Sequence, residues 1–433
     1  MIPLSVPNIC GNELRYVTQA ISDGWVSTGG PSINKFEDEF ACYSGLEYAA
    51  ACQSGTAALH IALLDAGVGA GDLVLTPVLT FIASVNPIRY VWADPVFLDC
   101  DDSLCIDPVK LEDYLRNECE LRGDGACYDK SLDRPIKAII VVHIFGNTAD
   151  MEGIVSLAKE FNLIIIEDAA EAVGTFFTSG AYSGKMAGAI GDYGIFSLNG
   201  NKIITTGGGG VFTSPNSGCV SRMRHLSTQA KTDEIYYTHD AVGYNYRMTN
   251  VQAAIGLGQL EQLESFIAKK HANYELYIEN GINLLPFRKG IRPNYWFYSY
   301  LCDSGGQVAT LAGGQNATQT GVQSATQTGV QSASAGGVQI AGRSGGRSGG
   351  RGGGADKKLR DKLIRHLYSR GIQTRPIWGL CNEQPMYRNC KAYRIERAHF
   401  YYDRVINLPC STNLTENDVR HVANEIKSFL KKY

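Results

Sequence analysis

The sequence predicts an α/β protein, with a large domain built on a mainly parallel sheet between helices and a smaller α+β domain after it. Short apolar runs alternate with helical segments from about residue 45 to residue 215, which is the pattern of layered α/β domains. Three of these runs are apolar almost without alternation, as in strands buried on both faces. The chain has 433 residues, more than one hydrophobic core normally supports. We therefore place a large domain at 1–265 and a small domain at 266–433.

The elements follow from local patterns. We expect strands at 73–76, 138–142, 163–167 and 193–197, where apolar and β-branched residues gather. A helix is expected over 54–66, because Leu59, Leu63 and Ala66 fall on one face. A helical stretch over 248–285 leaves the large domain. The last helix is expected over 415–432, with Thr415 as its cap and Asp418 in its first turn.

One segment differs in composition from the rest. Residues 304–355 contain no acidic and no aromatic residue, and an eight-residue near-repeat begins with QNATQTGV and QSATQTGV. Such a composition buries too little apolar surface to offset its chain entropy, so we expect a disordered insertion in the small domain. The alternative is a tether or interaction segment, with Arg343, Arg347 and Arg351 as a weak basic patch. Strong helix formers resume at Asp356 and end at Gly371.

Composition and charge exclude several classes of protein. Hydrophobic residues make up 44% and charged residues 19%, which suits a soluble globular enzyme. The net charge of −3 argues against a nucleic-acid-binding protein, which normally carries a basic excess. The longest apolar stretches are too short to span a bilayer, and the amino terminus lacks the pattern of a secretory signal. We therefore expect a cytoplasmic protein with no nucleic-acid or membrane partner.

The cysteines and histidines predict no metal site. The 12 cysteines are scattered in apolar context without a CxxC pair, so we expect buried free thiols. No histidine lies at metal-ligand spacing from cysteines or carboxylates. His143 follows a predicted strand, and a core histidine with satisfied hydrogen bonds is the narrowly preferred interpretation.

The central chemical signal is FSLNGNKIITTGGGG at 196–210. Lys202 follows the end of a strand and enters a glycine-rich turn. Enzymes that use pyridoxal 5'-phosphate (PLP) need an amine at such a place to form a Schiff base with the cofactor aldehyde. Ser197, in the same loop, can donate to the cofactor phosphate. A solvated lysine is the alternative if this motif stands alone.

A second motif, LIIIEDAAEAVG, supports the same chemistry. Asp168 stands at the end of a predicted strand, where ligands collect in open α/β sheets. A buried carboxylate there can pair with a pyridine nitrogen and keep it protonated. The alternative is a helix-capping aspartate. Glu171, three residues further on, can face the cofactor ring or the substrate, and we rank this role below that of Asp168.

Two upstream motifs complete the predicted site. QSGTAALHIAL places Gly55 and Thr56 at the start of a helix, where amide groups and the helix dipole attract a phosphate. An ordinary helix cap is the alternative. In TPVLTFIAS, Phe81 can stack on the pyridine ring, although a core phenylalanine explains this residue equally well.

Together these motifs resemble the DegT/DnrJ/StrS family of PLP-dependent nucleotide-sugar aminotransferases. The resemblance covers nearly the whole chain outside 304–355, and it implies the fold-type I, aspartate aminotransferase-like fold. The stretches that carry it, besides those quoted above, are IPLSVPNICGNE, GWVSTGGPSINKFEDEF, LSTQAK, GYNYRMTNVQAAIG, TRPIWGL and NLPCSTNLT. Within the family, the sequence is most similar to the LegC-type branch, which makes legionaminic-acid-like sugars.

The resemblance assigns roles to single residues. The positions match the Schiff-base lysine at Lys202, the partner of the pyridine nitrogen at Asp168, the phosphate contacts at Gly55, Thr56 and Ser197, and the ring-stacking aromatic at Phe81. Asn245 matches an asparagine that relatives send to the cofactor phosphate of the neighbouring subunit, which implies a homodimer with composite active sites. Glu171 stands where many relatives carry Gln or His, so its ring contact is a departure from the common pattern.

The implied reaction moves an amino group from L-glutamate to the 4-keto group of a UDP-linked N-acetyl-4-keto-6-deoxyhexosamine, for a surface polysaccharide or glycan. One alternative is a GDP-perosamine-type sugar aminotransferase. Another is a non-catalytic regulatory protein with the PLP fold. Relatives that act as sugar dehydratases replace the lysine with histidine, so Lys202 argues against that chemistry.

Overall fold

The computed structural model describes residues 1–233, 235–302 and 353–432. The predicted insertion at 304–355 lies outside these ranges, apart from its last three residues. Those three residues belong to helix α10 (Gly353–Ser369), which therefore begins earlier than predicted. A helix start tolerates glycine better than a helix interior does, and for this reason composition alone placed the boundary too late.

A mixed, largely parallel sheet forms the centre of the molecule, as predicted. Neighbouring strands are parallel from β9 to β14, whereas β10 runs antiparallel between β1 and β9. In spatial order the strands are β1 (Ala49–Cys52), β10 (Gly210–Thr213), β9 (Tyr193–Ser197), β7 (Ile164–Asp168), β6 (Arg134–Val142), β2 (Leu73–Pro77), β3 (Asp94–Leu98) and β14 (Ala392–Tyr393). A hairpin of β4 (Cys119–Leu121) and β5 (Cys127–Asp129) extends from β6.

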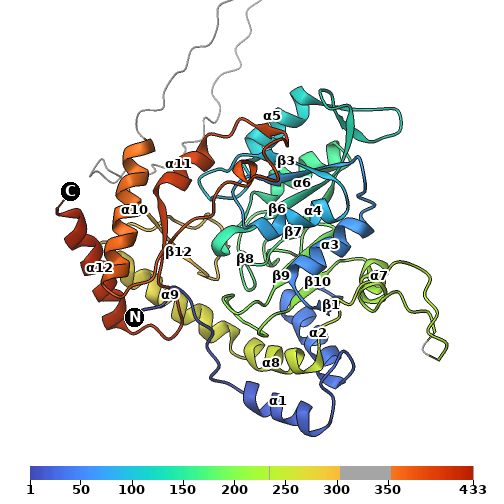
Figure 1. The fold of residues 1–433 in the computed structure, drawn as a ribbon, viewed down its shortest axis with the longest axis horizontal. Helices are drawn as coiled ribbons and strands as arrows, with labels where there is room; N and C mark the ends of the chain where they lie inside the picture. Colours follow the sequence, from blue (N-terminus) through green and yellow to red (C-terminus); the bar gives the residue numbers. More distant parts are fainter. Residues whose placement is uncertain (234, 303–352, 433) are drawn as a thin grey trace, which may run out of the picture.

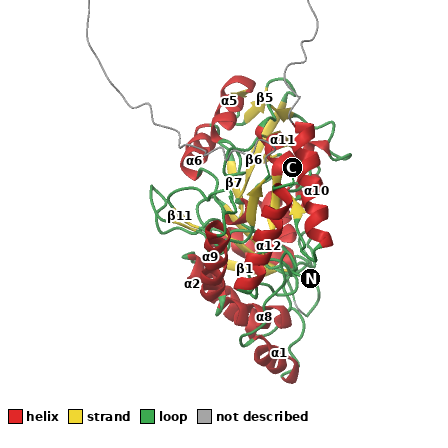
Figure 2. Cartoon of the chain, turned by 90° about the vertical axis from the view of Figure 1, so that its left-hand side faces the viewer, coloured by secondary structure: helices red, strands yellow, loops and turns green. Residues whose placement is uncertain are grey.

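Helices enclose this sheet, and Figure 2 shows β6 and β7 between them. Helix α3 (Gly55–Asp65) packs on β9 and β10 and begins where the Ser54 hydroxyl accepts the amide of Ala57 at 3.1 Å. The other helices of this part are α1 (Glu13–Ser22), α2 (Pro31–Ser44), α4 (Asn86–Tyr90), α5 (Pro108–Glu118), α6 (Met151–Glu160) and α7 (Ser217–Ser227). Short 3-10 turns lie at Ile82–Ser84, Ile144–Gly146 and Cys381–Glu383.

The helical stretch predicted over 248–285 is two helices, α8 (Asn250–Leu260) and α9 (Leu263–Glu279). Helix α8 packs against α1 and α2, whereas α9 packs against a helix near the carboxyl terminus. The break at 261–262 lets the two helices follow these different surfaces, which amphipathic periodicity alone does not reveal. Helix α9 continues across residue 265, and the division into domains at this point stays a prediction.

The carboxyl-terminal part contains a small antiparallel sheet in the order β12 (Tyr298–Leu301), β15 (Val405–Leu408), β13 (Arg375–Pro376). Figure 1 shows α10, α11 (Arg397–Arg404) and α12 (Glu416–Leu430) at one end of the molecule. Helix α12 begins with the predicted cap, because Thr415 and Asp418 form a reciprocal capping box. A two-stranded ladder joins β8 (Phe176–Phe177) to β11 (Ile291–Arg292), and a bridge joins Ile2 to Ile372 near the amino terminus.

The cysteines are free thiols, and only Cys10 and Cys42 are exposed, which confirms the expectation of mostly buried thiols. Within the described ranges, no helix has the length and apolar character needed to cross a membrane. Over the same residues, no group of three histidine, cysteine or carboxylate side chains is placed to hold a metal ion.

Candidate active site

A cavity of about 380 Å³ opens at the carboxyl ends of three neighbouring parallel strands, β6, β7 and β9. Val142, Asp168 and Ser197 end these strands and line the cavity. This is the edge at which open α/β sheets bind ligands. The cavity brings together seven of the eight predicted site residues, namely Gly55, Thr56, Phe81, Asp168, Glu171, Ser197 and Lys202.

Asp168 is buried and held from two sides. Its Oδ2 accepts the hydroxyl of Ser84 at 2.7 Å, and its Oδ1 accepts the amide of Ala170 at 3.1 Å. Ser84 also lies 3.0 Å from the hydroxyl of Thr80. The chain turns after Asp168 rather than starting a helix, so the carboxylate is not a helix cap. The arrangement leaves a fixed, buried carboxylate on the cavity wall.

Lys202 and Glu171 form a pair inside the cavity. The Lys202 Nζ lies 3.4 Å from Oε1 of Glu171, and their side chains are only 11% and 4% exposed. Glu171 Oε2 accepts the amide of Phe145 at 2.9 Å. Phe145 adopts a left-handed conformation with φ of 57°, which aims this amide at the carboxylate. Glu171 therefore contacts the amine of Lys202 directly, a contact that the sequence did not predict.

Burial raises the pKa of Glu171 to about 7, although Lys202 and the Phe145 amide act in the opposite direction. The folded protein thus keeps the Glu171 proton between about pH 4.5 and 7, where the unfolded chain loses it. A raised carboxyl pKa lowers stability as the pH rises through this window, by up to about 3 kcal/mol. Glu171 is therefore poised to exchange a proton near neutral pH.

Replacing Glu171 with glutamine is expected to remove this pH-dependent loss of stability. The thermal midpoint of cofactor-free Glu171→Gln minus that of cofactor-free wild type should be larger at pH 8 than at pH 5. The reason is that only wild type must ionise a buried carboxyl as the pH rises. Thermal unfolding of both proteins at the two pH values tests this. An equal difference between the proteins at both pH values contradicts the proton-retaining Glu171.

The start of α3 lies close to the end of β9, beside the cavity. Ser54, Gly55, Thr56 and Ser197 all line the cavity. A Cβ atom on Gly55 would lie 3.2 Å from Cβ of Ser197 and 3.3 Å from the carbonyl oxygen of Phe196. Glycine at this position therefore keeps the helix start close to the β9 loop and leaves room for a phosphate at the positive end of the helix.

An aromatic wall faces the same cavity. Its members come from three separate stretches of chain and are Phe81, Trp296, Phe297 and Trp378. The Phe81 ring is half-exposed and its centroid lies 6.0 Å from that of Trp378. Phe81 is thus a cavity residue rather than a core residue, which rules out the alternative interpretation of this position.

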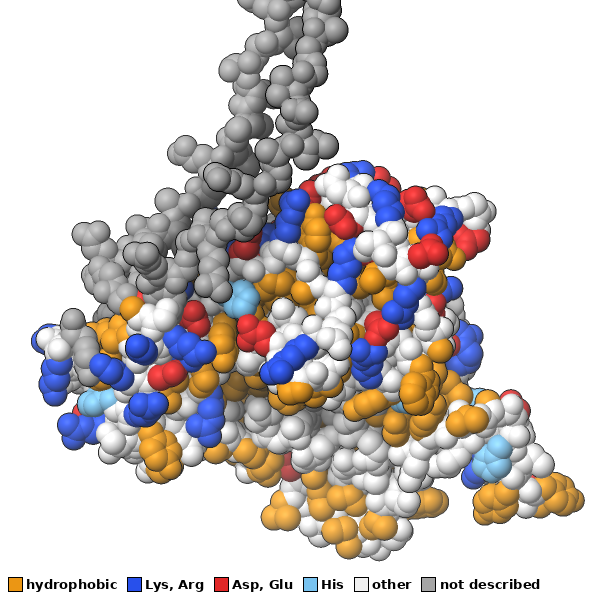
Figure 3. Space-filling model, turned by 45° about the horizontal axis from the view of Figure 1, so that its top comes forward, with side chains coloured by type: hydrophobic (Ala, Val, Ile, Leu, Met, Phe, Trp, Pro, Cys, Tyr) orange, Lys and Arg blue, Asp and Glu red, His pale blue; other side chains and the backbone are white. Residues whose placement is uncertain are grey.

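Asn245 does not line the cavity of its own chain. It lies in the segment between α7 and α8, where it bridges to Thr228, and it is exposed. This segment protrudes from the body of the molecule (Figure 1), and hydrophobic side chains gather at the projection on the lower right of Figure 3. Ile235, Tyr236 and Val242 of this segment are each about four-fifths exposed.

His143 is a buried core residue, as preferred from the sequence. Its Nε2 lies 2.9 Å from Oε2 of Glu167, and its Nδ1 accepts the amide of Ala149 at 3.2 Å. Although burial opposes it, the hydrogen bonds of His143 and of backbone amides hold the pKa of Glu167 below its usual value. His143 therefore has a structural role, since it links the end of β6 to Glu167 of β7.

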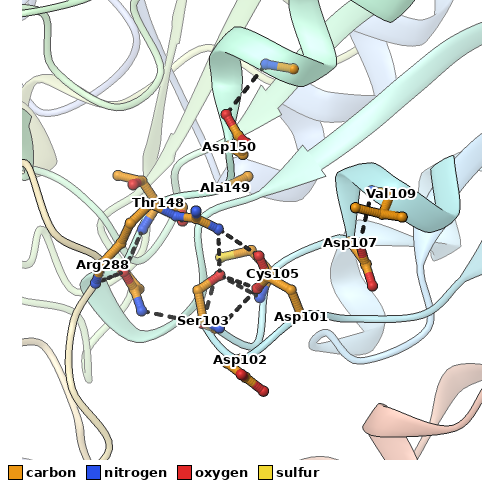
Figure 4. A network of polar contacts seen from close by, with 12 residues as sticks. Asp101, Asp102, Ser103, Cys105, Asp107, Val109, Thr148, Ala149, Asp150 and Arg288 are labelled. Carbon is orange, nitrogen blue, oxygen red and sulfur yellow. Dashed lines mark hydrogen bonds and ion pairs between the residues drawn. The ribbon is translucent and has the colours of Figure 1, made fainter. Parts of the chain in front are cut away.

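Sequence reasoning missed Arg288, which holds the turn that carries Phe145. Figure 4 shows its guanidinium between the loop of Asp101 and Ser103 and the backbone of Thr148. Arg288 donates to Asp101 Oδ2 at 2.6 Å and to the Thr148 carbonyl at 3.0 Å, and its amide donates to Asn147 Oδ1 at 2.9 Å. A lone arginine outside every motif carries no local signal of such a role.

The residues present fit PLP. An amine for the cofactor aldehyde, a buried carboxylate for the pyridine nitrogen, and a helix start that glycine keeps open for a phosphate meet in one cavity. Lys202, Asp168 and the Ser54–Thr56 turn are thus the groups that can hold the aldehyde, the ring nitrogen and the phosphate of this cofactor.

Comparison with known proteins agrees with this geometry. Residues 7–291 and 354–427 match the sequence model of the DegT/DnrJ/EryC1/StrS aminotransferase family. GDP-perosamine synthase of Escherichia coli O157:H7 is 33% identical over 431 residues, which cover 99% of this chain and 98% of that protein. The synthase of the same name from Caulobacter vibrioides is 33% identical over 434 residues, which cover 99% and 98%.

A solved structure supports the fold. The DegT/DnrJ/EryC1/StrS aminotransferase of Brucella abortus superposes with a TM-score of 0.76 at 23% identity, covering 96% of this chain and 95% of that one. The match of both sequence and fold extends over the parts that build the cavity. The chain therefore belongs to the DegT/DnrJ/EryC1/StrS aminotransferase family and is a PLP-dependent aminotransferase.

Proposed function

We propose that this enzyme moves an amino group from L-glutamate to the 4-keto group of a nucleotide-linked 4-keto-6-deoxy sugar. One observation carries the proposal: Lys202, Asp168 and the start of α3 line a single cavity beside an aromatic wall. The charged side can hold the cofactor, and the aromatic side offers apolar faces to a sugar ring or a base.

The cofactor-holding residues divide the work. Lys202 would supply the amine that holds PLP covalently, Asp168 would pair with its ring nitrogen, and Gly55, Thr56 and Ser197 would hold its phosphate. When bound, PLP supplies an electron sink that weakens bonds at the carbon bearing the amino group. Asp168 favours a protonated ring nitrogen because its negative charge is buried and fixed by Ser84.

Lys202 and Glu171 handle the proton. Once the Lys202 Nζ is free, it accepts a proton as a general base and returns it as a general acid. Glu171, with its Oε1 3.4 Å from this nitrogen, stabilises the charged form and orients it. Because burial raises the Glu171 pKa to about 7, this carboxyl changes charge close to neutral pH. Lys202 and Glu171 together can therefore hold one proton for transfer inside a mostly buried site.

Two acceptors are candidates. A UDP-linked N-acetyl-4-keto-6-deoxyhexosamine is the acceptor of the LegC-type branch that the sequence resembles. A GDP-linked 4-keto-6-deoxy sugar is the second candidate, and it is favoured by two relatives named GDP-perosamine synthase that match along almost their entire length. The two acceptors share the reacting ketone and differ in the nucleotide and in the N-acetyl group.

A homodimer with composite active sites is part of this proposal. Asn245 lies outside its own cavity, on a protruding segment with exposed Ile235, Tyr236 and Val242. A second copy that covers this apolar segment would bring Asn245 toward the partner's cofactor phosphate. Light scattering of the purified protein tests the dimer, and a monomer at working concentration contradicts it. The cytoplasmic location stays a prediction.

The visible absorbance of the PLP-loaded protein tests the reaction. L-glutamate is expected to bleach the cofactor band, and the correct 4-keto sugar nucleotide is expected to restore it, because the two half-reactions run in opposite directions. Recovery with the UDP-linked sugar supports the first acceptor, and recovery with the GDP-linked sugar supports the second. A band that glutamate leaves unchanged contradicts the proposed donor. Failure of both sugars contradicts the proposed acceptor class.

A further inference from the structure

Trp296 is a buried tryptophan on the cavity wall, only 2% exposed. Three polar contacts fix its position. Its amide donates to Asn294 Oδ1 at 2.9 Å, its carbonyl accepts Lys270 Nζ at 3.1 Å, and its indole Nε1 donates to the Asn201 carbonyl at 2.8 Å. The ring also stacks on Phe297, with centroids 4.1 Å apart. Trp296 therefore has little freedom to move.

The support of Trp296 leads back to the turn that carries Glu171. The Asn294 amide group donates to the carbonyls of Glu171 and Val173, both at 2.9 Å. The segment around Trp296 and the turn after β7 are thus joined by hydrogen bonds in the buried interior. These hydrogen bonds fix the segment that carries Trp296 against the turn that carries Glu171.

Lys202 lies within reach of both groups. Its Nζ lies 4.2 Å from the centroid of the Trp296 ring and 3.4 Å from Glu171 Oε1. An ammonium over an aromatic face is attracted by the ring quadrupole, most strongly by tryptophan and where water is excluded. The same indole donates to the carbonyl of Asn201, the residue directly before Lys202. One side chain therefore contacts both the amine of Lys202 and the backbone carbonyl of the residue before it.

We propose that Trp296 is a positioning residue for Lys202: its ring face stabilises the free ammonium beside Glu171, and its indole N–H holds the turn that carries the lysine. The ring interacts with the charged amine and not with a neutral one, so Trp296 favours the proton-bearing state of Lys202. This proposal rests on the role given to Lys202 under the proposed function.

The test is the pH profile of Lys202 acetylation in the full-length protein after removal of PLP. Acetic anhydride reacts with the neutral amine, and mass spectrometry of the Lys202 peptide measures the rate at each pH. The high-pH plateau reports access to the amine, and the rate relative to this plateau reports its protonation. This readout needs no catalytic turnover.

Three variants separate the contributions. Trp296→Met fills much of the volume without a ring. At pH values below the plateau, this variant is expected to raise the acetylation rate, expressed as a fraction of the plateau rate, about fivefold. This ratio corresponds to ~1 kcal/mol of lost ammonium stabilisation. Trp296→Phe keeps a ring face but lacks the indole N–H, and its profile should stay within about twofold of wild type. Trp92→Leu removes an exposed tryptophan outside the cavity and should leave the profile unchanged.

Two results overturn the proposal. One is a wild-type profile in Trp296→Met. The other is an equal change in Trp296→Phe and Trp296→Met, which would assign the effect to the indole N–H or to packing rather than to the ring face. Circular dichroism checks that each variant folds, and Trp296→Leu replaces the methionine variant if that protein is unfolded. Borohydride reduction of the PLP-loaded wild type, followed by peptide mass analysis, tests the cofactor role of Lys202 separately. If PLP is not found attached to Lys202, the proposed function is wrong, and this result is independent of the acetylation profile of the Trp296 variants.

Discussion

Replacing Lys202 with alanine is expected to reduce amino transfer by at least about 10⁴-fold, because the variant loses both the covalent attachment and the acid–base group. The cavity, the buried carboxylate of Asp168 and the start of α3 remain, so the variant should still bind PLP without a covalent link. Single-turnover bleaching of the cofactor band by L-glutamate measures the loss. Activity within tenfold of wild type would falsify the role of Lys202.

Two companion variants sharpen this experiment. Lys202→Arg keeps a positive charge near Glu171 and Trp296, but a guanidinium neither forms the imine nor releases its proton at neutral pH. It should therefore be as inactive as Lys202→Ala, which shows that charge alone does not suffice. Lys185→Ala removes an exposed lysine outside the cavity and should keep wild-type rates.

Asp168→Asn is expected to lower kcat/KM by roughly 10²–10³-fold, since an amide cannot supply the negative charge that keeps a ring nitrogen protonated. Asparagine has nearly the same shape, and its oxygen can still accept the Ser84 hydroxyl. The folded structure should therefore survive. The measurements are steady-state kinetics with the sugar acceptor and the dissociation constant of PLP. A loss below threefold contradicts the assignment of Asp168.

Ser84→Ala serves as the graded control for Asp168. It removes the hydroxyl that donates to Asp168 Oδ2 at 2.7 Å but leaves the carboxylate charged. A hydrogen bond to a charged group contributes ~1.5–3 kcal/mol at most, and Ala170 still donates to the other oxygen. We expect a loss of roughly tenfold, well short of the Asp168→Asn effect. An equal loss in both variants indicates that orientation, rather than charge, is what Asp168 provides.

The elements around the site could be predicted because their signals are local. The predicted strand at 193–197 coincides with β9, and the strand predicted at 163–167 is β7 shifted by one residue. Helix α3 spans Gly55–Asp65, one residue shorter at each end than the helix predicted over 54–66. The order of the strands and the break between α8 and α9 could not be predicted, because both depend on which surfaces meet in space.

Some cavity residues could likewise be predicted from local sequence, whereas others could not. Lys202, Asp168 and the Gly55–Thr56 turn stand at strand ends or at a helix start, where backbone geometry and residue chemistry point to a ligand whatever the rest of the chain does. Phe81 had two equal interpretations from the sequence, and only its half-exposed place on the cavity wall decided between them. Asn245 stays a prediction because its role requires a second subunit.

The chemistry proposed for the site could be predicted from local sequence: an amine before a glycine-rich turn, a carboxylate at the end of a buried strand, and a helix start suited to a phosphate. The residues that hold and orient these groups could be found only in the folded structure. Ser84 reaches Asp168 across 84 residues, and Trp296 reaches Asn201 across 95. Contacts at such separations leave no periodicity and no motif in the sequence, since they arise only when packing brings distant segments to one edge of the sheet.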